Sequence, residues 1–212
     1  MADIFSFLPT GDGTEADKAV TTMVGTNTQR RVLQQRALSY TTLSFRYQQI
    51  EPQERLDLLN YFKTKRGKYS AFWVRTFHPD FVLTENGIAG QSEVYVEVTD
   101  LGLAFSLKPV YIYFRSLDFA TRVVAVESGR TDPDTGAVIS TKFKLAQSLP
   151  AAITLSKNNS PCQIERLYYC RFDQDTISFS HKKMVLSECT LKFRELPHET
   201  PSNIVHPTEG EH

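Results

Sequence analysis

Apolar and polar positions alternate through much of the chain with the period of two that is typical of a half-buried β-strand. Leu43, Phe45 and Tyr47 follow this alternation, whereas Tyr40 has the opposite parity, which predicts a bulge near Thr41. Short strands separated by turn residues favour a mostly β fold, either a sandwich or a barrel. We expect strands over residues 33–49, 69–77, 94–98, 110–114, 122–126, 138–145, 152–155, 164–172, 176–179 and 184–194.

One segment, residues 52–66, has the apolar spacing of an α-helix. Pro52 suits the first helical turn, because its missing N–H has no helical partner there. Gly67 follows the last turn, at a position where helices often end in a left-handed residue. The apolar side chains expected to cover one broad face of this helix are Leu56, Leu58, Leu59 and Phe62.

The two ends of the chain lack a clear hydrophobic period. Residues 1–32 are polar and rich in Gly and Thr after a short apolar patch, so we expect an extended arm or a long loop that needs a partner surface. Residues 199–212 are rich in Pro and His and have little apolar content. We expect them to form a flexible tail unless a neighbouring molecule binds it.

Charge and cysteine content narrow the possible functions. The 212 residues include 24 Lys and Arg and 24 Asp and Glu, so the formal net charge is zero. A general nucleic-acid binder carries a basic excess, which this chain lacks. The three cysteines have no metal-binding spacing and are expected to be reduced, buried thiols. The sequence shows neither a signal peptide nor an apolar stretch long enough for a membrane span.

The sequence contains no recognisable catalytic or cofactor motif, such as G-x-S-x-G, H-E-x-x-H, a Walker loop or G-x-G-x-x-G. We therefore expect no enzymatic activity, no cofactor and no metal site. Asp132 and Asp134 resemble the opening of a calcium loop, but the later acidic ligands are missing. A hairpin turn around Gly136 is the favoured interpretation of this segment.

Several phrases, taken in order along the chain, resemble the distal tail protein family of long-tailed bacteriophages and gene transfer agents. The resemblance covers about residues 27–196, which is most of the chain. The phrases are R-V-L-Q-Q-R at 31–36, Y-F-K-T-K-R-G at 61–67, D-T-G-A-V at 134–138, R-F-D-Q-D at 171–175 and R-E-L at 194–196.

The resemblance implies a structural protein of the virion tail tip, assembled in the host cytoplasm. Its family forms rings, usually of about six copies, that join the tail tube to the tail-tip or baseplate hub. The implied partners are further copies of the chain, the tail tube protein and the hub protein. The tape-measure protein and DNA would pass through the lumen without specific binding, and no membrane would be involved.

The same resemblance implies how the domains are arranged. Residues 1–80 and 163–198 would form a ring domain, a β-sandwich with one flanking helix that resembles a tail tube subunit. Residues 81–162 would form an inserted β-barrel or sandwich.

Two other classes of function stay open. One is a carbohydrate-binding β-sandwich module of a virion or cell-surface assembly, and the other is an enzyme of lectin-like fold, which would need a convergent cluster of acidic residues.

The candidate interface residues are Arg30, Arg31, Gln34 and Arg36. The surrounding segment has few apolar side chains and gains little from a core of its own. Arginine binds carboxylates with two parallel bonds and is enriched at interfaces. We expect this segment, with the arm before it, to lie against the next subunit or the tube. The alternative is a solvated edge strand protected by charge against aggregation.

Overall fold

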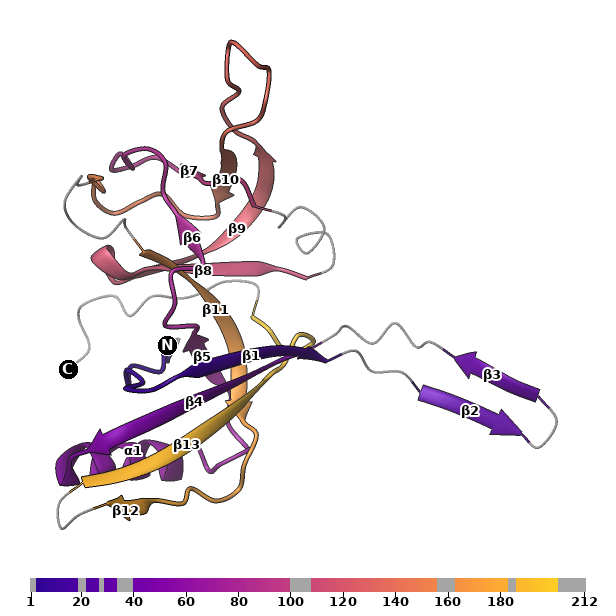
Figure 1. The fold of residues 1–212 in the computed structure, drawn as a ribbon, viewed down its shortest axis with the longest axis vertical. Helices are drawn as coiled ribbons and strands as arrows, with labels where there is room; N and C mark the ends of the chain where they lie inside the picture. Colours follow the sequence, from indigo (N-terminus) through magenta and orange to yellow (C-terminus); the bar gives the residue numbers. More distant parts are fainter. Residues whose placement is uncertain are drawn as a thin grey trace. The chain divides into compact units, whose positions relative to one another are not determined.

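The computed structural model describes residues 3–18, 22–26, 29–33, 40–99, 108–155, 163–182 and 186–201 (Figure 1). This part of the chain is mostly β with one α-helix, which confirms the predicted fold class. The helical elements are α1 (Pro52–Thr64) and the 3-10 turn η1 (Arg115–Leu117). The strands are β1 (Gly13–Lys18), β2 (Thr22–Thr26), β3 (Gln29–Leu33), β4 (Tyr40–Ile50), β5 (Phe72–Arg75), β6 (Phe81–Val82), β7 (Glu93–Val96), β8 (Val110–Phe114), β9 (Phe119–Ser128), β10 (Thr141–Leu145), β11 (Gln163–Phe172), β12 (Ser180–Lys182) and β13 (Leu186–Glu195).

The chain divides into two compact units. Unit 1 consists of Met1–Ile4, Trp73–Tyr168 and Pro201–His212, and unit 2 consists of Phe5–Phe72 and Tyr169–Thr200. Each unit has its own hydrophobic core, as expected for separately packed bodies. The division of the chain into a ring domain (residues 1–80 and 163–198) and an inserted domain (residues 81–162) stays a prediction.

The sheet of unit 2 is antiparallel, with the strand order β1–β4–β13 and then the end of β11 beside β13. Buried and non-buried residues alternate along β4 from Tyr40 to Gln48, and its pairing with β1 is continuous from Tyr40 to Phe45. The predicted bulge near Thr41 is therefore wrong, because Thr41 itself takes a fully buried position. The pairing of β4 is irregular at the other end, between Ser187 and Cys189 of β13.

Aromatic side chains fill the core of unit 2. The rings of Phe62 and Phe172 lie 4.8 Å apart, and those of Phe172 and Phe193 lie 5.2 Å apart. Phe5 is fully buried, with its ring 5.1 Å from that of Phe193. The expectation that residues 1–32 form only an arm or a loop therefore needs correction, because Phe5 anchors the start of this segment in the core and β1 joins the sheet.

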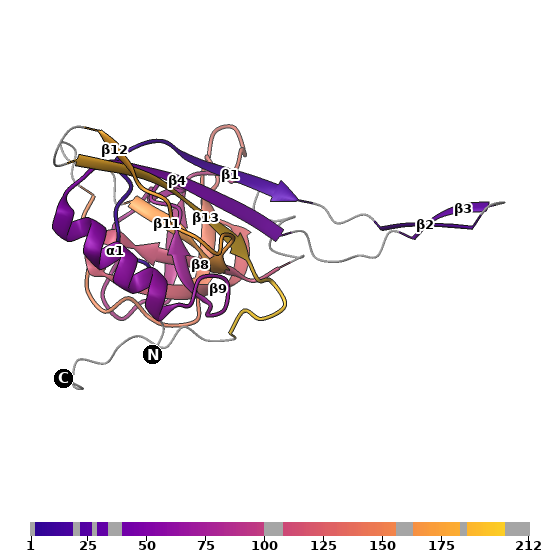
Figure 2. The same cartoon turned by 90° about the horizontal axis from the view of Figure 1, so that it is seen from below.

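Helix α1 lies against one face of this sheet (Figure 2). Glu51 forms a capping box with Glu54, which satisfies two free N–H groups at the first turn. Leu58 and Phe62 are buried, but the side chain of Leu56 is 49% exposed, so the apolar face is narrower than predicted. No helix among the described residues is long and apolar enough to cross a membrane.

The strands of unit 1 close into a barrel, in the order β6–β11–β8–β9–β10–β7. The last pairing returns to the first strand, because Leu83 bridges Val96 and the N–H of Glu97 donates to the carbonyl of Val82. Inward positions alternate with outward ones, and the inward side chains fill the interior. The largest of these interior side chains are Phe81, Phe114, Phe119 and Phe143.

Candidate functional site

The predicted interface residues fall partly within a two-stranded ribbon. Arg30 and Arg31 occupy consecutive positions of β3 and pair with β2, whereas Gln34 and Arg36 lie outside the described residues. Within the described ranges, β2 and β3 pair with each other and with no third strand. An isolated two-stranded ribbon is at best marginally stable in water. A third strand or another surface would stabilise the ribbon.

Strand β1 is an edge of the unit 2 sheet. It pairs with β4 on one side, and on its other side no described residue pairs with it. The positions from Gly13 to Asp17 are exposed, and the hydroxyl of Thr41 holds the carboxylate of Asp17 at 2.6 Å. Charged side chains on an exposed edge discourage non-specific pairing while leaving the backbone groups open to a matching partner.

The face of this sheet that points away from the aromatic core is hydrophilic. It carries charges of both signs, including an ion pair in which Arg46 lies 3.4 Å from Glu188. The guanidinium of Arg194 lies over the ring of Tyr40, 4.3 Å from its centre. Further polar residues of β4 and β13 on this face are Thr42, Ser44, Gln48, Thr190 and Lys192.

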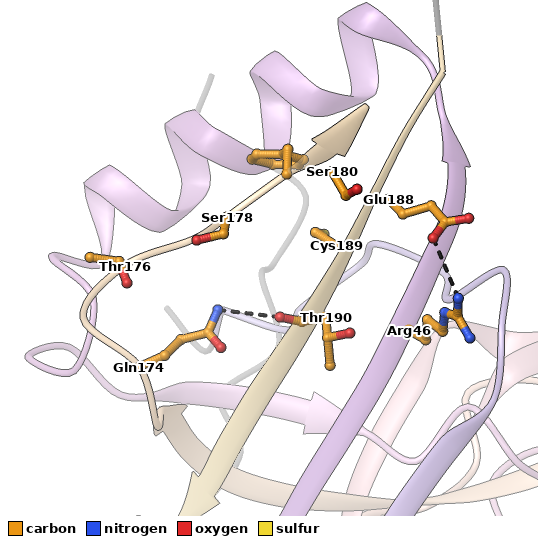
Figure 3. Close-up of a pocket in the computed structure, with 9 residues that line it drawn as sticks. Arg46, Gln174, Thr176, Ser178, Ser180, Glu188, Cys189 and Thr190 are labelled. Atoms are coloured by element: carbon orange, nitrogen blue, oxygen red, sulfur yellow. Dashed lines mark hydrogen bonds and ion pairs between the residues drawn. The ribbon is translucent and has the colours of Figure 1, made fainter. Parts of the chain in front are cut away.

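A cleft of about 750 Å³ lies beside β13 in unit 2 (Figure 3). One wall is the segment 174–180, which connects β11 to β12, and the other is β13 with the neighbouring Arg46 of β4. The sequence predicts a strand over residues 176–179, and this prediction is wrong. The segment runs away from β13, pairs with it only from Ser180 onward, and leaves the cleft between them.

Both ends of the segment 174–180 are fixed. At its start, the N–H of Asp173 donates to the carbonyl of Lys192 at 2.8 Å, and Asp175 pairs with Lys68 at 3.1 Å. At its end, His181 Nδ1 lies 3.0 Å from the hydroxyl of Ser187. The wall of the cleft is therefore held in place without a ligand, as in most small-molecule sites.

Unit 1 contains a buried ion pair on the outer face of its barrel. Nε of Arg75 lies 3.7 Å from Oε2 of Glu165, with the side chain of Glu165 only 1% exposed. The guanidinium of Arg75 lies between the rings of Phe77 and Tyr113, 4.7 Å from the centre of each. Burial raises the pKa of Glu165, and the positive charges of Arg75 and Arg115 oppose this rise.

The backbone around this pair is strained. Phe77 has a φ of 57°, in the left-handed region that non-glycine residues rarely adopt, and its N–H donates to the carboxylate of Glu165. A single acidic residue in the largely apolar strand sequence Q-I-E-R-L-Y-Y-C is the signal that could have identified Glu165. Its partner on β5 is too distant in the sequence to be predicted.

The segment that resembles a calcium loop is a turn closed by its own hydrogen bonds. One carboxylate oxygen of Asp132 accepts the N–H of Asp134 at 2.9 Å, and the other accepts the hydroxyl of Thr135 at 2.8 Å. These bonds lower the pKa of Asp132. Gly136 has a φ of 69°, which explains why glycine occupies this position. Within the described ranges, His, Cys, Asp and Glu residues form no cluster of three that could hold a metal ion.

Comparison with models of known protein families finds no match to this chain, and comparison with curated proteins finds none either. The assignment of a function therefore depends on the phrases in the sequence and on the geometry described above.

Proposed function

We propose that this chain is a structural subunit of a ring at the distal end of a long-tailed bacteriophage tail. The ring joins the tail tube to the tail-tip hub, and DNA and the tape-measure protein pass through its lumen. This function places the protein at the tail tip of the virion and gives it an assembly role with no catalytic step.

The observation that carries the proposal is the convergence of the resembling phrases in unit 2. All but the turn at 134–138 belong to this unit, although they are widely separated in the sequence. Phe62, from the phrase at the end of α1, packs against Phe172 from the R-F-D-Q-D phrase. A Cβ added to Gly67 would lie 3.5 Å from the carbonyl oxygen of Gln174. The phrase at 171–175 also pairs with that at 194–196, with Arg171 opposite Arg194. Because these three phrases contact one another, they behave as parts of one fold.

The open edges of unit 2 suit assembly. Repeated copies in a ring join a surface of one subunit to a different surface of the next, and exposed strand edges provide such surfaces. Within the described part of the chain, neither the β2–β3 ribbon nor the outer edge of β1 pairs with a further strand. Arg30 and Arg31 add donors that bind carboxylates with two parallel bonds.

The hydrophilic sheet face suits a lumen. Its hydroxyl groups are neutral, Glu188 pairs with Arg46, and the guanidinium of Arg194 lies over the ring of Tyr40, which leaves Lys192 as the remaining cation that β4 and β13 carry on this face. The zero net charge of the chain agrees with this role.

Substitution of both Arg30 and Arg31 by Ala tests the interface. We expect the melting temperature of the isolated chain to stay nearly unchanged and ring or tail assembly to fail, because the substitutions remove contacts made only in the assembly. The matched control replaces two cations of α1, Arg55 and Lys63, and should assemble normally. Particles with a normal tail tip in the Arg30 and Arg31 variant would refute the interface role.

A further inference from the structure

The cleft beside β13 interrupts the sheet of unit 2 over a short distance. Strand β11 pairs with β13 up to Phe172 opposite Phe193, and β12 resumes the pairing at Ser180 opposite Glu188. Between these points, the side chain of Gln174 donates a long bond of 3.5 Å to the backbone carbonyl of Thr190. The cleft therefore contains main-chain groups that a ligand can reach.

The shape of the cleft excludes an extended peptide. A strand added along β13 would need an open path at both ends of the gap. One end is closed by the bond from the N–H of Asp173 to the carbonyl of Lys192, and the other by the pairing of Ser180 with Glu188. The occupant must therefore be compact and must enter from the face of the sheet.

The lining of the cleft favours a neutral ligand with many hydroxyl groups. Arg46 and Glu188 are the charged residues of the lining, and they pair with each other, so their charges cancel. The ring of Phe179 provides an apolar surface on which the C–H face of a sugar can pack. The remaining polar side chains can both donate and accept hydrogen bonds. They are Gln174, Thr176, Ser178, Ser180 and Thr190, of which Figure 3 shows Thr176, Ser178 and Ser180 on the connecting segment, across the cleft from Thr190.

We propose that this cleft binds one or two units of a neutral saccharide. Such a ligand combines hydroxyl groups around its rim with apolar C–H faces, which matches the two kinds of lining. The volume of about 750 Å³ lies within the range of small-molecule sites. The Arg46–Glu188 pair presents a donor and an acceptor side by side and is suited to two neighbouring hydroxyl groups. The cleft shares Arg46 and Glu188 with the sheet face proposed for the lumen, and sugar binding by the isolated chain does not depend on ring assembly.

The test uses the full chain and NMR. D-glucose, D-galactose, N-acetyl-D-glucosamine and maltose are added at about 10 mM, well above the Kd of a weak specific ligand, with glycerol as the comparison polyol. We expect at least one sugar to show saturation transfer from the protein and to shift the backbone amides of residues 174–180 and 188–190. Gln174→Ala and the nearly isosteric Thr190→Val should each weaken this binding about tenfold.

The matched control is Gln53→Ala, which removes a carboxamide that bonds Asp57 on the exposed face of α1, outside the cleft. It should bind the sugar as the unaltered chain does. Because Thr190 is exposed, Thr190→Val is expected to fold even if Gln174→Ala does not. The proposal is overturned if no sugar binds, if the shifts lie elsewhere, or if both cleft variants bind normally. Glycerol that shifts the same amides as strongly as the sugars would also overturn the saccharide assignment.

Discussion

Removal of the Arg75 guanidinium should destabilise unit 1 strongly, and more at neutral than at acid pH. The side chain of Arg75 is 12% exposed and that of Glu165 is 1% exposed, so solvent screens their attraction little. Loss of one member of a buried ion pair typically costs about 3–5 kcal/mol, because the other charge stays buried without compensation. Arg75→Met is the appropriate change, since it keeps an aliphatic chain between the rings of Phe77 and Tyr113.

The pH dependence follows from the raised pKa of Glu165. A carboxyl with a raised folded-state pKa contributes stability below its unfolded pKa and loses it as the pH rises through the folded value. Arg75 holds this pKa down, so Arg75→Met raises it further. Arg115 also lowers this pKa and Asp80 raises it, and both remain in the variant. The loss of stability should therefore be full at about pH 8 and smaller at about pH 5, where Glu165 is more often protonated.

The assay is urea denaturation followed by the fluorescence of Trp73. This residue is the only tryptophan of the chain, it belongs to unit 1, and its ring lies 4.7 Å from that of Tyr111. The double variant Arg75→Met with Glu165→Gln is the control and should recover most of the lost stability, because no unpaired charge remains and the amide oxygen can still accept the N–H of Phe77. A loss below about 1 kcal/mol, or a loss that is the same at both pH values, would refute this reasoning.

Two further predictions concern unit 2. Phe62→Ala should lower the free energy of unfolding by about 3–5 kcal/mol, measured by a denaturant titration followed by far-UV circular dichroism. Leu56→Ala, on the exposed side of α1, should lower it far less. Equal losses would mean that Phe62 is not part of the core. Burial raises the pKa of Cys189 to about 12, so iodoacetamide should label Cys189 in the folded chain up to about a thousandfold more slowly than in urea, as measured by peptide mass spectrometry; equal rates would contradict its burial.

Local signals predicted α1 and most strands correctly, because each depends on residues close together in the sequence. Pro52 begins the helix, and Gly67, with a φ of 57°, follows its end. The strand positions follow from the period of two in segments such as β4 and β13. The exposure of Leu56 was not predicted, since the apolar spacing alone does not fix how far the helix is rotated toward the sheet.

Features that depend on contacts between residues far apart in the sequence were not predicted. Phe5 lies in the short apolar patch that precedes the polar part of the N-terminal segment, and its burial involves Phe193 near the other end of the chain. The strand predicted over 176–179 has the correct alternation, but hydrogen bonds at Asp173 and pairing at Ser180 fix its ends and hold its middle away from β13. The cleft therefore depends on how β11 and β12 are aligned along β13, and the alternation of apolar and polar residues does not determine that alignment.

The central claim, that this chain forms a ring, is tested most directly by native mass spectrometry of the purified full-length protein combined with electron microscopy of the same sample. At a concentration of about 10 µM, we expect a closed ring with a single lumen and a mass that is an integral multiple of the chain mass, with about six copies. A species that stays monomeric across concentrations, or open chains of variable length, would contradict the account.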